Sequence, residues 1–267
     1  MEKEITSFKI FSNSDEKAQK IAKKLQKEMI FNGFLQKESG FDLAIAVGGD
    51  GSFLRMVKEN NFNDDVFYVG VNAGTLGFLQ EIKPDEISEF IQKLKVQYYK
   101  IEETSIQETV VDYDDGIKSF YSLNEVVIRE AKLKTAYLDV FINDVLLENF
   151  VGDGLLISTS CGSTAYNLSF GGSVVYNDLH TLQITPIAPL NSKAYKSLIN
   201  SIIVPENKLI KIIPTKIVKD LHLVVDGENI IFENVKSIQT KTANKKIKIL
   251  RLSVYDYTKV INEKFLN

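Results

Sequence analysis

Short apolar runs alternate with amphipathic segments over about the first hundred residues of the chain. Three of these runs are bounded by polar residues or glycine, as is typical of buried strands: Phe8–Phe11, Leu43–Val47 and Val66–Val71. Between the first two runs, apolar residues recur at helical spacing from Ala18 to Met29, behind a capping segment at Ser14–Glu16. Strands that alternate with helices predict a parallel, Rossmann-like sheet, so we expect an α/β domain over residues 1–100.

Two further segments have a helical pattern. Pro84 fits the first position of a helix with acidic residues behind it, and apolar residues follow on one face: Ile87, Phe90, Ile91 and Leu94. Near the other end of the chain, Tyr255–Phe265 predicts a closing helix. The pattern leaves open whether residues 251–267 pack back on the first domain.

The character of the chain changes after about Tyr99, where helical patterns become scarce. Strands are predicted at Thr109–Tyr113, Ser119–Arg129 and Ala136–Ile142. Two pairs of turn residues lie between apolar runs and predict β-hairpins: Asn143-Asp144 and Asp226-Gly227. We therefore expect a mostly antiparallel β domain over residues 101–250.

The stretch Gly48-Gly49-Asp50-Gly51-Ser52 joins the second predicted strand to a segment of helical composition, for which Ser52 is the expected cap. In such a junction, backbone N–H groups and the positive end of the helix converge on an anion. Asp50 does not fit anion binding alone, because a carboxylate repels phosphate unless it binds a metal or takes a proton from a hydroxyl. The alternative is a plain strand-to-turn junction in which Asp50 caps the next helix.

Polar residues gather at three other places in the β-rich half: Asn124-Glu125, Gly152-Asp153-Gly154 and Ser160–Ser169. The last of these contains Gly162-Ser163-Thr164-Ala165-Tyr166, which offers close backbone access, small hydroxyls and one flat ring. These groups suit a purine base. The alternative is a turn and helix cap with Tyr166 in the core.

Composition limits the classes of function. With 267 residues, 44% of them hydrophobic, the chain can form a large core in one or two domains. The 32 basic residues against 35 acidic ones, without a long basic block, argue against a nucleic-acid partner. One cysteine and two histidines argue against a thiolate or imidazole metal cage, so we assign no metal ligand, although an oxygen-bound Mg²⁺ stays open. Since no signal-peptide core or membrane-length apolar run occurs, we expect a cytoplasmic protein without a membrane partner.

Taken together and in this order, G-G-D-G, L-N-E-V, G-D-G and G-S-T-A-Y resemble the NAD kinases. The resemblance covers nearly the whole chain. It implies that the adenosine ribose 2′-hydroxyl of NAD⁺ is phosphorylated, with ATP as donor and Mg²⁺ or another divalent cation, to give NADP⁺. It also implies an active site between an α/β domain and a β domain, and a homodimer or homotetramer.

The resemblance assigns a role to each matching residue. Asp50 is the base that accepts the 2′-hydroxyl proton, and Gly51 belongs to the same pocket. Asn124 and Glu125 hold the adenine and ribose of NAD, and Asp153 positions the dinucleotide. The remaining residues line the nucleotide site, with Phe78 as an aromatic wall: Thr164, Ala165, Tyr166, Asn167, Leu168, Ser169 and Ala188.

The chain departs from the family pattern in four places. Ser52 replaces Thr or Asn, and Thr75 stands where many bacterial members carry histidine. Ser160-Cys161 replaces Pro followed by Thr or Ser, and Val151 occupies a position that is arginine in some members. The first departure is mild, whereas the other three put individual ligand contacts in doubt.

Two other functions fit parts of the pattern. The G-G-D-G element is shared with 6-phosphofructokinases and with lipid kinases, but no sequence feature here demands an acyl groove or a sugar-phosphate site. A non-catalytic NAD(P)-binding sensor on the same fold is the second alternative, and retention of Asp50 argues against it. The sequence leaves open the range of phosphoryl donors, the use of NADH, the oligomer size and any feedback by NADP.

Overall fold

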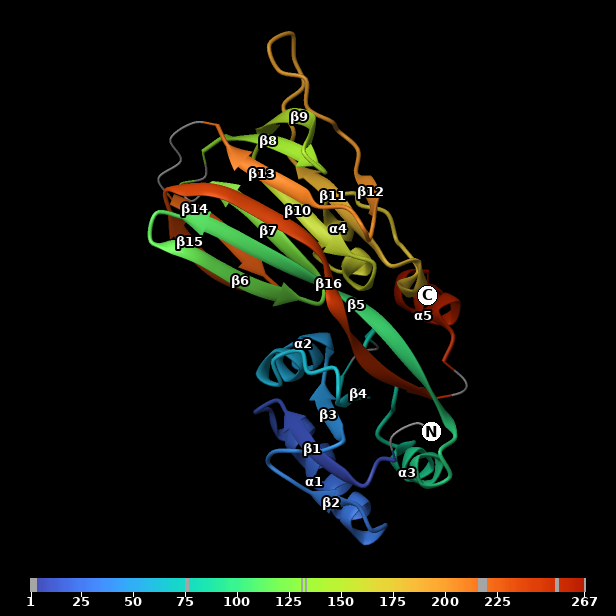
Figure 1. The fold of residues 1–267 in the computed structure, drawn as a ribbon. Coiled ribbons are helices and arrows are strands. Elements are labelled where there is room, and N and C mark those ends of the chain that lie inside the picture. Colours follow the sequence, from blue (N-terminus) through green and yellow to red (C-terminus); the bar gives the residue numbers. More distant parts are fainter. Residues whose placement is uncertain are drawn as a thin grey trace. The chain divides into compact units, whose positions relative to one another are not determined.

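The computed structural model describes residues 4–74, 77–130, 132, 134–215, 220–252 and 255–266 (Figure 1). Thr75, one of the departures from the family pattern, lies outside these residues. The chain forms two compact units, one made of Met1–Glu103 with Lys246–Asn267 and the other of Thr104–Lys245. We call them unit 1 and unit 2 and describe each by itself.

Unit 1 contains the predicted parallel sheet. Its strands are β1 (Ser7–Ser12), β2 (Leu35–Gln36), β3 (Leu43–Gly48), β4 (Phe67–Asn72) and the end of β16 (Val235–Leu252). They lie in the order β2-β1-β3-β4-β16, with every neighbouring pair parallel. All residues of β3 and β4 are buried, as expected for inner strands of a parallel sheet.

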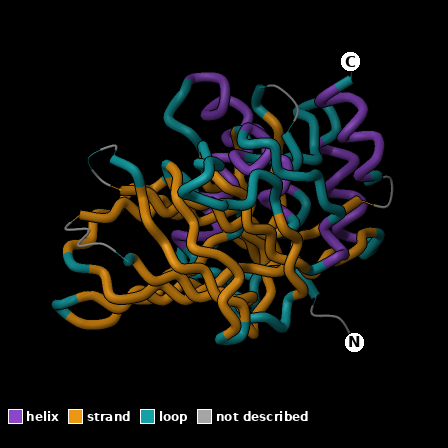
Figure 2. Tube along the Cα trace, turned by 90° about the horizontal axis from the view of Figure 1, so that it is seen from above, coloured by secondary structure: helices purple, strands orange, loops and turns teal. Residues whose placement is uncertain are grey.

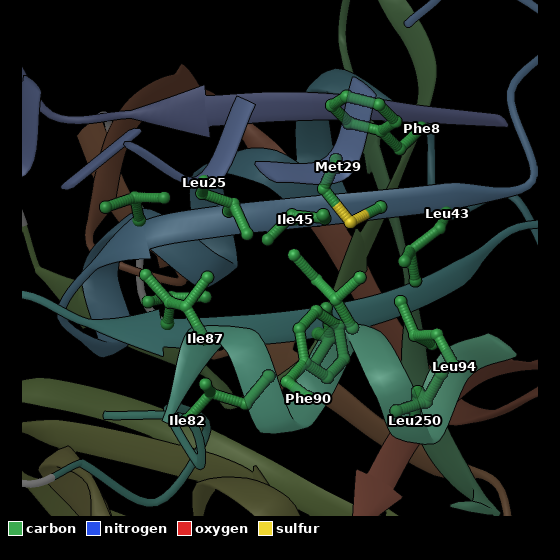
Figure 3. Close-up of a cluster of buried hydrophobic side chains, with 14 of the residues drawn as sticks. Phe8, Leu25, Met29, Leu43, Ile45, Ile82, Ile87, Phe90, Leu94 and Leu250 are labelled. Carbon is green, nitrogen blue, oxygen red and sulfur yellow. The ribbon is translucent and has the colours of Figure 1, made fainter. Parts of the chain in front are cut away.

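Unit 1 has four helices among its described residues. They are α1 (Glu16–Phe31), α2 (Asp50–Glu59), α3 (Ile87–Lys95) and α5 (Tyr257–Phe265). Leu25 and Met29 of α1 and Phe90 of α3 are fully buried in one cluster with Leu43 and Ile45 of β3 (Figure 3). The hydrophobic positions at helical spacing thus form this core.

Two predicted helix starts are wrong. Helix α2 begins at Asp50 with Gly49 as its N-cap, so Ser52 does not cap it, and the Ser52 hydroxyl donates to Asn13 Oδ1 instead.

Helix α3 begins at Ile87 with Glu86 as N-cap, so Pro84 lies before the helix. Glu86 Oε2 accepts the N–H of Lys83 at 3.0 Å, which closes a turn ahead of the helix.

Unit 2 consists mainly of antiparallel strands. One sheet has the order β12-β11-β10-β7-β14-β15, and its members are β7 (Glu125–Glu130), β10 (Gly154–Thr159), β11 (Thr181–Ile187), β12 (Ile202–Pro205), β14 (Asp220–Val225) and β15 (Glu228–Glu233). The strands of the other sheet that belong to unit 2 are β8 (Ala136–Ile142), β9 (Val145–Gly152), β13 (Ile210–Pro214), β6 (Gly116–Ser122) and most of β5 (Tyr99–Tyr113) and β16. Buried residues of both sheets, such as Ile128, Ile157, Val140 and Ile212, form one hydrophobic cluster.

The connections of unit 2 include both predicted hairpins. Asn143 and Asp144 have φ values of 48° and 65°, and Asp226 and Gly227 have 46° and 85°, as type I′ turns require. Short helical turns are η1 (Cys161–Thr164), α4 (Tyr166–Ser169) and η2 (Asn177–Leu179). Strand exceeds helix along the trace as a whole (Figure 2).

The single strand predicted over Ser119–Arg129 is wrong, because β6 ends at Ser122 and β7 begins at Glu125. No described helix has the length and apolar character needed to cross a membrane.

Candidate functional site

In unit 1, Asp50 is the first residue of α2, directly after β3 and the glycine turn. Gly48 has no room for a side chain, because a Cβ there would lie 2.2 Å from Ser52 Oγ. Gly51, by contrast, is exposed at the start of the helix, and a Cβ added to it would have no neighbouring atom within 4 Å. The chain thus presents an open backbone at the positive end of α2.

The Asp50 carboxylate is held by the loop that follows β4. Its Oδ2 accepts the N–H of Phe78 and its Oδ1 accepts the N–H of Leu79, each at 3.0 Å. A Cβ on Gly77 would lie 2.2 Å from Oδ1, so only glycine lets the carboxylate reach these amides. Each carboxylate oxygen has a second lone pair, and the half-buried side chain can therefore still accept a proton or a hydrogen bond.

The same loop is connected to the glycine turn by Gln80, a residue that is 1% exposed. Its Nε2 donates to the carbonyl of Gly49 at 2.8 Å. Gly70 makes room for it, since a Cβ there would lie 2.3 Å from Gln80 Oε1. Asn72 Oδ1 accepts the N–H of Gly74 at 2.7 Å and shapes the start of the loop.

In unit 2, Asn124 and Glu125 lie where β7 begins, and their backbone N–H groups donate hydrogen bonds to Asp226. The Asp226 carboxylate accepts three successive N–H groups, from Leu123 at 2.7 Å, Asn124 at 2.8 Å and Glu125 at 3.1 Å. On the carbonyl side, the N–H of Thr159 donates to Asn124 O at 2.8 Å. These bonds explain the break between β6 and β7 and fix the backbone that carries both side chains of the pair.

Glu125 is 7% exposed, and its Oε2 has no hydrogen-bond partner within the described part of the chain. Its carboxyl accepts the backbone N–H of Tyr166. Burial raises the pKa of Glu125 to about 8, and the negative charge of Asp226 acts in the same direction, against that N–H bond. At neutral pH the side chain is therefore mostly protonated and can donate a hydrogen bond as well as accept one.

The segment Thr164–Ser169, which contributes the Tyr166 N–H to this carboxyl, contains residues of different exposure. Tyr166 is 43% exposed and stands edge-on to Phe170 with ring centroids 4.7 Å apart, so the alternative that places Tyr166 in the core is wrong. Thr164, Ala165 and Leu168 are half-buried or exposed, and Ser169 lies at the end of α4. An exposed ring beside small residues can stack on a flat ligand.

Asn167 supports this segment from behind. It is fully buried, and its Nδ2 donates to the carbonyls of Ser163 at 3.2 Å and Ser173 at 3.4 Å. Its Oδ1 accepts the hydroxyl of Thr185 at 2.6 Å. The Asn167 side chain thus uses its hydrogen bonds within the protein. The neighbouring Cys161, 7% exposed, is buried as well.

Asp153 and Ala188 lie together at the other end of β10. The N–H of Asp153 donates to Ile187 O at 3.0 Å. Both Asp153 and Ala188 are exposed. Ala188 has a φ of 44°, which is strained for a residue other than glycine. Gly154 begins β10, whereas Ser158 is the residue that pairs with Glu125. Four residues of strand, about 13 Å, separate the two groups along β10. The predicted residues of unit 2 therefore form two groups and not one.

Two residues that shape the candidate site, Asp226 and Gly77, have no clear signal in the sequence. The pattern indicates Asp226 only as a turn residue, and the feature that reveals its second role, its proximity to Leu123–Glu125, exists only in the fold. Gly77 lies in a loop with several small residues, where an isolated glycine can mark a close approach of two chain segments.

Two protein-family models and several known proteins match this chain. The ATP-NAD kinase N-terminal domain matches residues 2–99, and the ATP-NAD kinase C-terminal domain matches residues 123–252. An NAD kinase of Finegoldia magna is 36% identical over 270 residues, which cover 96% of this chain and 97% of that protein. The chain belongs to the NAD kinase family.

Solved structures agree in fold. The yeast NADH kinase, solved in complex with NADH, has a TM-score of 0.88 at 20% identity and covers 99% of this chain and 88% of its own. An NAD kinase from Archaeoglobus fulgidus, solved in complex with ATP, has a TM-score of 0.73 at 20% identity and covers 97% of both chains. The predicted α/β domain with a parallel sheet, the antiparallel β domain and the resemblance to NAD kinases are confirmed. The chain is accordingly an NAD kinase family enzyme, a phosphotransferase with an alcohol acceptor.

Proposed function

We propose that this chain transfers the γ-phosphoryl group of ATP to the 2′-hydroxyl of the adenosine ribose of NAD⁺. The 2′-oxygen forms a bond to the γ-phosphorus while the bond from that phosphorus to the β–γ bridging oxygen breaks, which gives NADP⁺ and ADP. Such a transfer needs a placed acceptor, a group that takes its proton, and neutralisation of the phosphate charge.

Asp50 is the proposed proton acceptor, and its arrangement carries the proposal. Its carboxylate is fixed by the amides of Phe78 and Leu79 beside an exposed helix start, where Gly51 leaves the backbone open. The amides hold the group in place and leave lone pairs for the hydroxyl proton. The N-terminal end of α2 adds a partial positive charge close to the phosphates.

The groups in unit 2 are proposed to bind the nucleotide. Glu125 and Asn124 hold the adenine and ribose, with the buried Glu125 carboxyl able to donate at neutral pH. Tyr166 offers the ring face for the adenine, and Asp153 positions the dinucleotide from the far end of β10. The other residues proposed for this site are Thr164, Ala165, Asn167, Leu168, Ser169 and Ala188, with Asn167 acting as their support.

A divalent cation is proposed to enter with ATP. Within the described ranges, no three or more His, Cys, Asp or Glu side chains converge so that they could hold a metal ion. Mg²⁺ bound mainly by the donor phosphates keeps its waters and needs few protein ligands, which fits this finding. We assign no residue of the chain to the ion.

The decisive experiment is an incubation of the purified chain with NAD⁺, ATP and Mg²⁺, coupled to an NADP-specific dehydrogenase. We expect a signal that requires all three components. Tight NADP binding without turnover would instead support the non-catalytic sensor. Turnover of ATP with a lipid or sugar acceptor and none with NAD⁺ would support a related kinase.

We also propose a cytoplasmic homodimer or homotetramer. The single cysteine suits a reducing compartment, since no intramolecular disulfide can form. Sedimentation equilibrium against the 30.1 kDa chain mass gives the subunit number, and a monomer at micromolar concentration would contradict an oligomer.

A further inference from the structure

The loop that holds Asp50 is itself held by the C-terminal part of unit 1. Phe78, whose amide donates to Asp50, is 9% exposed, and its ring packs against two rings of α5. The ring centroid of Tyr257 lies 5.8 Å away and that of Phe265 lies 5.5 Å away. The Phe78 ring, expected from the sequence to line the nucleotide site, thus packs against α5, a helix far from it in the sequence.

The same loop has two further anchors, one at a backbone carbonyl and one at a side chain. Tyr255 donates its hydroxyl to the carbonyl of Phe78 across 3.5 Å. Glu81 Oε1 accepts the N–H of Leu252 at 2.8 Å. The loop from Phe78 to Glu81 is therefore connected at both ends to residues between Leu252 and Phe265.

We propose that α5 is a positioning element for phosphoryl transfer, with Phe265 and Tyr257 seating Phe78 so that the loop amides fix the Asp50 carboxylate. The proposal rests on the proposed role of Asp50. It assigns a contribution to turnover to residues that touch neither the hydroxyl nor the phosphates.

The packing of α5 makes this role separable from folding. None of its nine residues is buried, and Phe265 is 42% exposed. A helix of nine residues is not stable alone, so its docking depends on contacts such as those with Phe78. Removing one ring should therefore loosen the loop and leave the core of unit 1, built from β1, β3, β4, α1 and α3, in place.

A double-mutant cycle tests the proposal. We expect Phe265→Ala to lower kcat by roughly three- to tenfold, the range for loss of one aromatic pair, with the KM for NAD⁺ changed less than about twofold. In an Asp50→Asn background the same substitution should change the residual kcat less than about twofold, because the carboxylate through which α5 acts is gone. Leu266→Ala, at an adjacent residue that is 74% exposed, is the matched control and should leave kcat unchanged.

Equal losses of kcat from Phe265→Ala in both backgrounds would overturn the proposal. Should thermal unfolding show that Phe265→Ala destabilises unit 1, Tyr257→Leu removes the second ring and repeats the cycle, and Phe265→Leu should restore most of kcat. If Asp50→Asn itself leaves kcat unchanged, the proposed base fails, and that outcome is distinct from an additive cycle.

Discussion

At the scale of single residues, burial changes the protonation of two carboxyl groups, those of Glu125 and Glu81. Glu125 and Glu81 both have a raised pKa, and burial is the largest cause for each. The sequence identifies Glu125 as a candidate binding residue but not its burial, and Glu81 has the pattern of an ordinary surface acid. Their state depends on neighbours such as Asp226 and Arg251 that come from distant parts of the chain.

Asp226→Asn tests the coupling at Glu125. Asn-Gly suits a type I′ turn, so we expect the hairpin to persist. Loss of the negative charge at position 226 should lower the pKa of Glu125 from about 8, so the carboxyl loses its proton at a lower pH. If the protonated form binds NAD⁺, the pH at which affinity falls should move down in the variant.

Calorimetric titration of NAD⁺ in small pH steps between about pH 6 and pH 9, on both sides of the pKa of Glu125, measures the direction of this shift. Asp144→Asn, at the exposed tip of the β8–β9 hairpin, is the control with similar turn geometry. A midpoint that is the same in Asp226→Asn and in the native chain would contradict the coupling.

Glu81→Gln tests the other carboxyl through stability. Burial raises the pKa of Glu81 from 4.5 to about 7, against the opposing charge of Arg251. Between about pH 4.5 and pH 7, the folded state therefore keeps a proton that the unfolded chain has released. The stabilisation from the protonated carboxyl is fully present below pH 4.5 and is lost as pH rises through about 7. Glutamine cannot ionise and can still accept the Leu252 N–H.

We therefore expect Glu81→Gln to gain stability relative to the native chain as pH rises from about 5 to about 8, by up to about 3 kcal/mol. Urea unfolding at the two pH values measures the difference. Glu263→Gln, at an exposed position of α5, should show no such trend. A difference in unfolding free energy that is constant with pH would show that Glu81 is ionised in the folded protein.

At the scale of elements, the sequence predicts those that have a repeating pattern. The apolar positions of α1 and α3 and the glycine-bounded strands β3 and β4 can be identified because burial leaves a periodic signal. The errors lie at element ends. The cap of α2 and the break between β6 and β7 depend on Gly49 and Asp226, whose roles are set by tertiary contacts.

Gly77→Ala tests how the loop after β4 serves Asp50. A Cβ at this position would lie 2.2 Å from Asp50 Oδ1, so the methyl group should push the carboxylate off the two amides. We expect kcat to fall by about tenfold or more, since a misplaced group loses most of its advantage. Gly74→Ala is the control in the same loop, because nothing lies within 4 Å of its added Cβ. Equal kcat values for the two variants would show that the seat of the carboxylate does not matter.

At the scale of the whole molecule, composition and motif order are enough to predict an α/β part, a β part and the family. They cannot show how the candidate residues group within each unit. Asp153 and Ala188 lie a strand length from Glu125, and Asn167 lies behind the segment with which it was expected to line the site. The register of β10 and the packing of Thr185 against Asn167 decide these placements, and neither has a signature in the local sequence.

The most direct test of the proposed role of Asp50 as the proton acceptor is the turnover of the Asp50→Asn variant. The variant keeps an acceptor oxygen for one loop amide and cannot take up the 2′-hydroxyl proton at neutral pH. We predict that kcat falls by roughly 10²–10⁴-fold, the usual contribution of a general base, while the Kd for NAD⁺ changes little. A kcat equal to that of the native enzyme would contradict the account.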